Sequence, residues 1–263
     1  MIKKLVILGF FSCLFSVGGF SYLLDQQMEQ PINLKQSTLI TVKPGTSLLS
    51  FSSVLVNKNW ISNRFWLRSY AKLYPEKAQI KTGTFKIKAN ISLKDLLKLL
   101  VIGKEHQFTI TFIEGSTFKQ WLEQLKKQPK LTHVLSNQSI RDIAQLLDIN
   151  KINPEGLFFP DTYAYTEGTT DLTILKWAHI KMKNKLASLW QKSSKNLPYQ
   201  NAYQVLIMAS IIEKETSVID EMPIISSVFV NRLRKKMRLQ TDPTVIYGLG
   251  DRYRGNIKRV HLR

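Results

Sequence analysis

Two carboxylates end an apolar segment of the chain, Tyr203–Thr216, and are the first candidates for chemistry. A helix that is apolar on every side is expected to be buried, so its polar end should meet a surface or a cleft. Glu213 and Glu215 point about 200° apart around such a helix, so only one of them can face a given site. Glu215 should rest on Ile211 and Ile212, and this apolar bed at a helix C-terminus favours the protonated carboxyl that a general acid for glycoside cleavage needs. The alternative is a Glu-Lys-Glu helix end that is simply solvated.

Carboxylates and aromatic rings also gather in Pro154–Tyr163, where proline and glycine hold an irregular path. Aromatic rings beside hydrogen-bonding groups suit the binding of sugar rings. The alternative is a packed loop that buries Phe158 and Phe159 in the core. A third segment, Val230–Gly250, has basic side chains that are typical of a solvated helix face, and its Gln240–Pro243 predicts a turn that presents side chains to a substrate.

The composition excludes several classes of protein. A chain of 263 residues, 44% of them apolar, can bury a core, which excludes a disordered or collagen-like chain. The single cysteine, Cys13, excludes an intramolecular disulfide framework, and four histidines with no helical pairing give no basis for a metal site, so we expect neither metal nor cofactor. The formal charge of +19 suggests an acidic partner, which is nucleic acid, anionic lipid or an acidic polymer.

The N-terminal residues narrow that choice of partner. Residues 5–24 carry no charge, and about 20 apolar residues suffice for a transmembrane helix. Lys3 and Lys4 precede this segment, so the positive-inside rule predicts a cytoplasmic tail at residues 1–4 and an exported body, which excludes nucleic acid. The alternative is a signal peptide cleaved near residues 16–18. Cys13 is interpreted as a buried cysteine of the span rather than a site of lipid attachment.

The remaining pattern predicts an α+β protein in two parts that follow a linker at residues 25–37. Residues 38–104 predict strands at 39–42 and 81–87 and helices at 48–56, 65–73 and 93–101, the last capped by Ser92 and ended by Gly103. Residues 105–263 predict a strand at 108–113 and helices at 118–125, 139–147, 171–190 and from about 203.

Four separated motifs occur in the order in which one known family has them: Glu155-Gly156 with Phe159–Tyr163, then Ala209–Thr216, Ser227–Leu233 and Met237–Gly248. The chain resembles the YceG-like endolytic murein transglycosylases from its apolar N-terminal segment to its end. The resemblance implies a transmembrane helix at residues 5–24, a small LysM-like α+β module at 38–104 and a mixed α/β lytic transglycosylase catalytic domain at 105–263.

The resemblance also implies a lyase that acts on peptidoglycan. Such an enzyme cleaves the β-1,4 bond between N-acetylmuramic acid and N-acetylglucosamine in nascent glycan strands, leaves a 1,6-anhydro end and so limits strand length. The family motif assigns the catalytic role to Glu215, the residue that the burial argument selects independently. One residue that acts as acid and then as base needs no second carboxylate, unlike the hydrolases. Glu155, Asp161, Gln240 and Asp242 become candidates for substrate binding.

Localisation and partners follow from the same resemblance. It implies a single-pass protein of the bacterial cytoplasmic (inner) membrane with its body in the periplasm, acting on peptidoglycan strands and accompanied by peptidoglycan synthases. Family members continue beyond the stretch that matches Tyr253–Gly255, so we expect the catalytic domain to be incomplete, as a truncated copy or a fragment. A membrane-tethered peptidoglycan-binding scaffold without catalysis is therefore the alternative function, and an anionic-lipid-binding membrane protein is a third.

Overall fold

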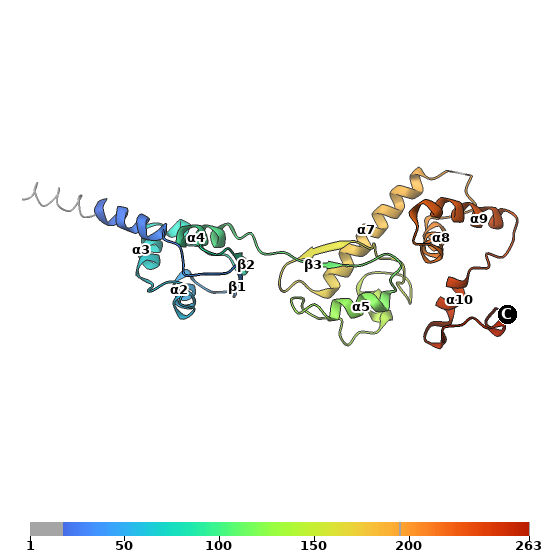
Figure 1. Ribbon diagram of the computed structural model, residues 1–263, viewed down its shortest axis with the longest axis horizontal. Helices are drawn as coiled ribbons and strands as arrows, with labels where there is room; N and C mark the ends of the chain where they lie inside the picture. The colour runs from blue at the N-terminus through green and yellow to red at the C-terminus, as the bar shows by residue number, and fades with distance from the viewer. Residues whose placement is uncertain (1–17, 195, 263) are drawn as a thin grey trace, which may run out of the picture. The chain divides into compact units, whose positions relative to one another are not determined.

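The computed structural model describes residues 18–194 and 196–262 and divides the chain into two compact units, Met1–Phe108 and Thr109–Arg263 (Figure 1). The division lies close to the boundary expected between residues 104 and 105. Each unit contains a small sheet and several helices, which confirms the expectation of an α+β protein.

Most of the segment predicted to cross a membrane, residues 5–24, lies outside the described residues. Its last part belongs to a helix at residues 18–28. Within residues 18–194 and 196–262, no helix is both long enough and apolar enough to cross a bilayer.

The prediction of a linker at residues 25–37 is wrong, because much of this segment belongs to the core of the first unit. Leu24 and Met28 lie one turn apart on the first described helix and are only 1% and 0% exposed. Ile32 and Leu34 are buried in the same core. These four apolar side chains attach the segment to the first unit. The sequence reading missed them because polar residues separate them along the chain.

A two-stranded antiparallel sheet packed with helices makes the first unit. Its elements are β1 (Thr38–Val42), β2 (Gly83–Ile87), α2 (Leu48–Asn57), α3 (Phe65–Leu73), the short 3-10 helix η1 (Pro75–Lys77) and α4 (Leu93–Ile102). The Ser92 side chain accepts a hydrogen bond from the Asp95 amide, and Gly103 ends α4 with φ 76°, so the predicted cap and stop of this helix are confirmed. Phe51 and Phe85 are at the centre of the core, each at most 1% exposed.

The second unit carries a second two-stranded sheet and the helices of the candidate site. Its elements are β3 (Phe108–Thr111), α5 (Phe118–Lys126), α6 (Ile140–Leu146), β4 (Thr162–Tyr165), α7 (Asp171–Lys192), α8 (Ala202–Glu215), η2 (Ile219–Glu221), α9 (Met222–Arg234), α10 (Asp242–Leu249), η3 (Gly250–Arg252) and η4 (Arg259–Leu262). Among the elements that differ from expectation, β4 begins inside the segment predicted to be irregular, and α10 begins inside the turn predicted at Gln240–Pro243. Pro243 falls in the first turn of α10, where proline is tolerated because its missing N–H would have no helical partner.

Stacked aromatic rings fill the core beside β3, β4 and α5. The rings of Phe112 and Trp121 stack with centroids 3.8 Å apart, and those of Phe118 and Phe158 stack at 4.9 Å. Phe158 is 5% exposed, so this ring belongs to the packed loop that the sequence left as an alternative to a sugar platform. From this part of the unit α7 extends as one long helix toward α8 and α9, which hold the candidate catalytic residue or pack beside it (Figure 1).

Candidate active site

Glu215 is the last residue of α8, and its carboxylate is held by the start of α10. The hydroxyl of Thr241 donates a hydrogen bond to Oε1 of Glu215. Thr241 is itself only 5% exposed, and its backbone carbonyl accepts a hydrogen bond from the Thr244 hydroxyl at 2.8 Å. The donor is therefore fixed by burial and by the first turn of α10, while the Glu215 side chain remains exposed.

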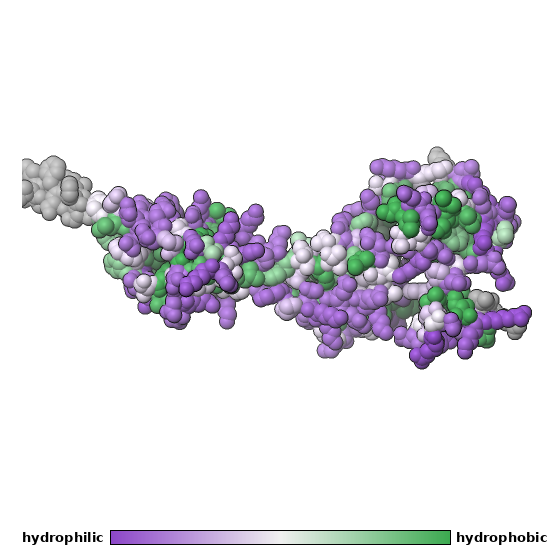
Figure 2. Space-filling model, in the orientation of Figure 1, coloured by the Kyte–Doolittle hydropathy of each residue, from purple (hydrophilic) through white to green (hydrophobic). Residues whose placement is uncertain are grey.

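The expectation that α8 is buried on every side is wrong. Met208 and Ile211 are buried and pack with Phe229 of α9, but Tyr203 and Ile207 on another side are 38% and 44% exposed. Figure 2 shows the resulting apolar surface, in green, over the part of the chain that holds α8 and α9. An all-apolar helix is buried only where neighbours surround it, and the described neighbours cover one side. Glu215 consequently lies in solvent rather than in the apolar bed expected from Ile211 and Ile212.

The turn between β3 and α5 comes close to the C-terminal end of α8. Gly115 has φ 69°, and a Cβ atom added to it would lie 3.2 Å from the Lys214 ammonium nitrogen and 3.4 Å from Cγ of Glu213. Glycine suits position 115 because the positive φ is strained for other residues, and an added Cβ would be in tight contact with the Lys214 side chain. Two residues immediately before Glu215 are therefore in contact with a turn about 100 residues earlier in the chain.

Gln240 and Asp242 lie on either side of Thr241 in sequence, so their backbones are close to the residue that contacts Glu215. Both side chains are exposed. Gln240 has φ 54°, a left-handed conformation that is uncommon outside glycine and that sends the chain from the end of α9 into α10. Two of the four predicted substrate-binding residues are therefore sequence neighbours of the hydroxyl that contacts Glu215.

Glu155 lies at the N-terminus of α5 instead. Its carboxylate accepts a hydrogen bond of 2.9 Å from the Phe118 amide, the first amide of the helix, where a negative charge is favourable. Glu155 also interacts with the phenol of Tyr247 in α10. Partial burial, followed by the charge and hydrogen bonding of Glu155, raises the pKa of Tyr247 above its ordinary value of 10.0. Glu155 therefore joins α5 to the same helix that begins with Thr241.

Asp161 pairs with a lysine of α7 and so helps to hold that helix in place. Its carboxylate forms an ion pair with Lys181 and accepts a 2.7 Å hydrogen bond from the Thr162 amide. The ammonium of Lys181, with help from that amide, lowers the pKa of Asp161 below its ordinary value of 3.8. No contact of this carboxylate with Glu215 or Thr241 exists among the described residues.

Comparison with known proteins shows which family contains this chain. The profile of the YceG-like family matches residues 40–263, most of the chain. The chain belongs to the YceG-like family. An endolytic murein transglycosylase of Bacillus subtilis is 27% identical over 253 residues, which cover 89% of this chain and 69% of the relative. One of Streptococcus pneumoniae is 26% identical and matches 91% of this chain.

A solved structure agrees with this assignment. The crystal structure of a YceG-like protein from Listeria monocytogenes matches with a TM-score of 0.50 at 26% identity, covering 87% of this chain and 80% of that one. The YceG-like chain spans 49% of the length of its streptococcal relative. The resemblance read from the four sequence motifs is confirmed.

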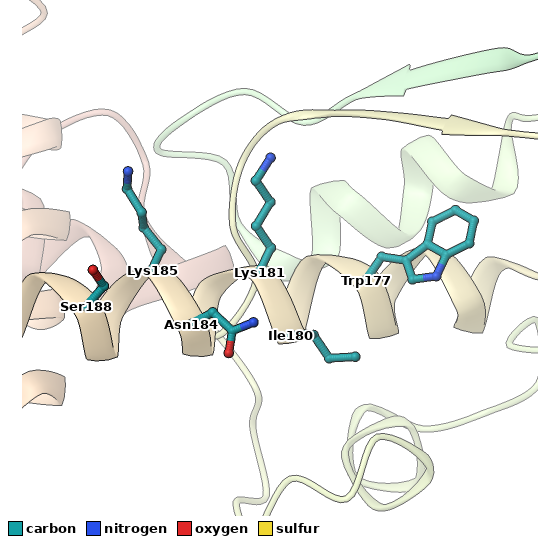
Figure 3. Close-up of a pocket in the computed structure, with 6 residues that line it drawn as sticks. All are labelled: Trp177, Ile180, Lys181, Asn184, Lys185 and Ser188. Carbon is teal, nitrogen blue, oxygen red and sulfur yellow. The ribbon is translucent and has the colours of Figure 1, made fainter.

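A surface hollow in this YceG-like chain lies away from Glu215. Its volume is about 510 Å³, and its lining comes from one face of α7: Trp177, Ile180, Lys181, Asn184, Lys185 and Ser188 (Figure 3). The lining contains none of the predicted site residues, although Lys181 pairs with Asp161. Within the described part of the chain, no three His, Cys, Asp or Glu side chains are grouped as a metal site would require.

Sequence reasoning about this YceG-like chain missed the partners of the catalytic candidate. Thr241 stood inside a predicted turn, but nothing in the spacing marked its hydroxyl as the group that would meet Glu215. Gly115 lies between the predicted strand at 108–113 and the predicted helix at 118–125, and nothing in the sequence indicates that it approaches α8. The sequence predicted no role for Lys151 or Tyr247, because packing between distant segments determines which residues lie beside them.

Proposed function

We propose that this chain is a peptidoglycan lyase, an endolytic lytic transglycosylase, with Glu215 as its single catalytic acid and base. The observation that carries the proposal is the Glu215 carboxylate, which is open to solvent at the end of α8 and oriented by the buried Thr241 hydroxyl. Membership of the YceG-like family, and relatives named endolytic murein transglycosylase, support peptidoglycan glycan strands as the substrate.

The reaction moves one proton away from Glu215 and one back. Glu215 gives its proton to the oxygen of the β-1,4 bond between N-acetylmuramic acid and N-acetylglucosamine, and the bond from that oxygen to C1 of the muramyl residue breaks. The carboxylate then takes the proton of the muramyl C6 hydroxyl while the C6 oxygen bonds to C1. The products are a free N-acetylglucosamine hydroxyl and a 1,6-anhydro end, and no water is consumed.

Thr241 would hold Glu215 in one orientation during both proton transfers. Its hydroxyl donates to Oε1 of Glu215, so Oε2 is the oxygen that carries the transferred proton. A fixed donor also reduces the number of side-chain rotamers that Glu215 samples before each proton transfer. We assign contacts with the sugars near the cut bond to Gln240 and Asp242, which flank Thr241, and positioning of α10 and α7 to Glu155 and Asp161.

We also propose the membrane location expected from the sequence. The uncharged residues 5–24 would anchor the protein in the bacterial cytoplasmic membrane, with residues 1–4 in the cytoplasm and the body in the periplasm. Residues 38–104 would serve as a LysM-like module that holds a glycan strand. Peptidoglycan synthases, which supply nascent strands, would then be partners.

The experiment that tests the activity is digestion of purified glycan strands by the full chain, with products identified by mass spectrometry. We expect 1,6-anhydro ends from the wild type, none from Glu215→Gln, and undiminished product from the matched control Glu213→Gln. Absence of anhydro ends from the wild type, or an equal yield from Glu215→Gln, would overturn the proposal. Strands that sediment with a wild-type chain that does not cut them would identify the scaffold instead.

A further inference from the structure

Lys151, Tyr203 and Tyr247 come together on the surface from three separate segments of the second unit. The Lys151 ammonium lies 3.1 Å from the centre of the Tyr203 ring. Tyr247 of α10 lies near enough to Tyr203 and Glu155 for both to affect its phenol. We call Lys151, Tyr203 and Tyr247 the tyrosine-lysine cluster.

The cluster is exposed; Glu155 engages the phenol of Tyr247, and the Lys151 ammonium contacts the ring of Tyr203. Tyr203 and Tyr247 are 38% and 57% exposed, and Lys151 is exposed as well. In the part of the chain that the structure describes, no carboxylate forms an ion pair with Lys151. A cation held over an aromatic ring at an open surface remains able to bind a carboxylate from outside the protein.

Two helices connect the cluster with the catalytic candidate. Tyr203 and Glu215 lie at opposite ends of α8, twelve residues apart, which is about 18 Å along the helix axis. α10 contacts α8, begins beside Glu215 at Thr241 and carries Tyr247 one and a half turns later. Because both helices join the two places, the cluster lies at a fixed separation from the reacting bond.

The chemistry of the cluster fits an acidic sugar. The tyrosine rings offer flat apolar faces, which suit the apolar face of a pyranose ring. Lysine supplies a positive charge for a carboxylate. Along a glycan strand only the muramyl residues carry a carboxylate, on the lactyl group, either free or continued as a peptide.

We propose that the tyrosine-lysine cluster is a remote substrate subsite that binds a carboxylate-bearing muramyl residue away from the bond that Glu215 cuts. The inference rests on the proposed function for the identity of the ligand. Such a subsite gives long strands an additional contact that short strands cannot make. The enzyme then selects strands by length.

The test is a binding measurement in which no strand is cut. Full-length chain carrying Glu215→Gln is titrated calorimetrically with purified long and short glycan strands, with and without the additional change Lys151→Gln. We expect Lys151→Gln to weaken the binding of long strands about tenfold. Strands whose lactyl carboxylates have been converted to amides should show no such difference. Tyr203→Ala should act like Lys151→Gln, whereas Tyr203→Phe, which keeps the ring, should bind like its parent.

A matched control is Lys183→Gln, which removes another exposed lysine from the second unit and should leave binding unchanged. Equal binding of long native strands with and without Lys151 would overturn the subsite, as would an equally large effect on amidated strands. Thermal melting of each variant separates a lost contact from a lost fold. Failure of the proposed activity appears in the digestion assay alone, so the two outcomes are distinguishable.

Discussion

The Thr241 hydroxyl donates its hydrogen bond to the Glu215 carboxylate across 26 residues of sequence. α9 and the turn after it lie between the two residues along the chain. The end of one helix and the start of another therefore form a single functional pair, although neither helix contains both groups. Changes that separate them should affect catalysis more than folding.

Thr241→Val should separate these effects, because valine keeps the branched shape at a site that is 5% exposed and removes only the donor. We expect kcat to fall about tenfold to a hundredfold, since a hydrogen bond to a charged group contributes about 1.5–3 kcal/mol. Steady-state kinetics on glycan strands measure the change. Thr241→Ser restores a hydroxyl and should recover most of the rate; a valine variant with the wild-type kcat would contradict the assigned role.

Gly115→Ala should test the contact between the β3–α5 turn and the end of α8. The positive φ of 69° alone should cost about 1 kcal/mol of the free energy of unfolding. The new methyl group would also press on Lys214, next to Glu215, so kcat should fall severalfold as well. Gly168→Ala is the matched control, since it has φ 88° with no atom within 4 Å of the added Cβ. Equal losses of activity in the two variants would argue against the contact.

Asp161→Asn should weaken the attachment of α7 in a pH-dependent way. The folded-state pKa of Asp161 is lowered by Lys181, so the stabilisation is present above the ordinary pKa of 3.8 and is lost as the pH falls through the folded-state value. The variant should melt at a slightly lower temperature than wild type at pH 7, and the two should converge in acid. Asp220→Asn, at an exposed aspartate, serves as the control. A difference that persists unchanged at low pH would contradict the ion-pair account.

Glu155→Gln should change the titration of Tyr247. Removing the carboxylate removes one cause of the raised pKa, so the phenol should ionise at a lower pH than in the wild type, yet still above 10.0 because partial burial remains. Absorbance of the phenolate at high pH measures this, and the difference from Tyr247→Phe assigns the transition to this residue. An unchanged midpoint would show that Glu155 does not act on Tyr247.

Local signals predicted the strands and helices of residues 38–104 and the C-terminal end of α8, but not the attachment of residues 24–34 to the first unit. The Ser92 cap, the Gly103 stop and the alternating residues of β1 and β2 depend on neighbours in sequence, which a pattern can read. Glu215 was chosen over Glu213 because it was expected to rest on Ile211 and Ile212, and because the family motif assigns the catalytic role to it. The same reasoning failed for the burial of that residue, because burial depends on which other elements cover the helix.

The contacts that define the site could not be predicted, since they join segments far apart in sequence. No spacing rule relates Lys151 to Tyr203 or Glu155 to Phe118. The sequence predicted Glu155 and Asp161 as substrate-binding candidates, which stays a prediction. Their partners, a helix N-terminus and a lysine of α7, show that such charges can serve architecture rather than ligand binding.

The helix at residues 18–28 sets a limit on how far the protein can be shortened from its N-terminus. Trimming to residue 38 would remove Leu24, Met28, Ile32 and Leu34 from the core of the first unit. At about 2 kcal/mol for each buried side chain, the loss is comparable with the whole free energy of unfolding of a small domain. Removal of the first 17 residues would take none of these four side chains. A shortened protein intended to stay folded therefore keeps this helix whole.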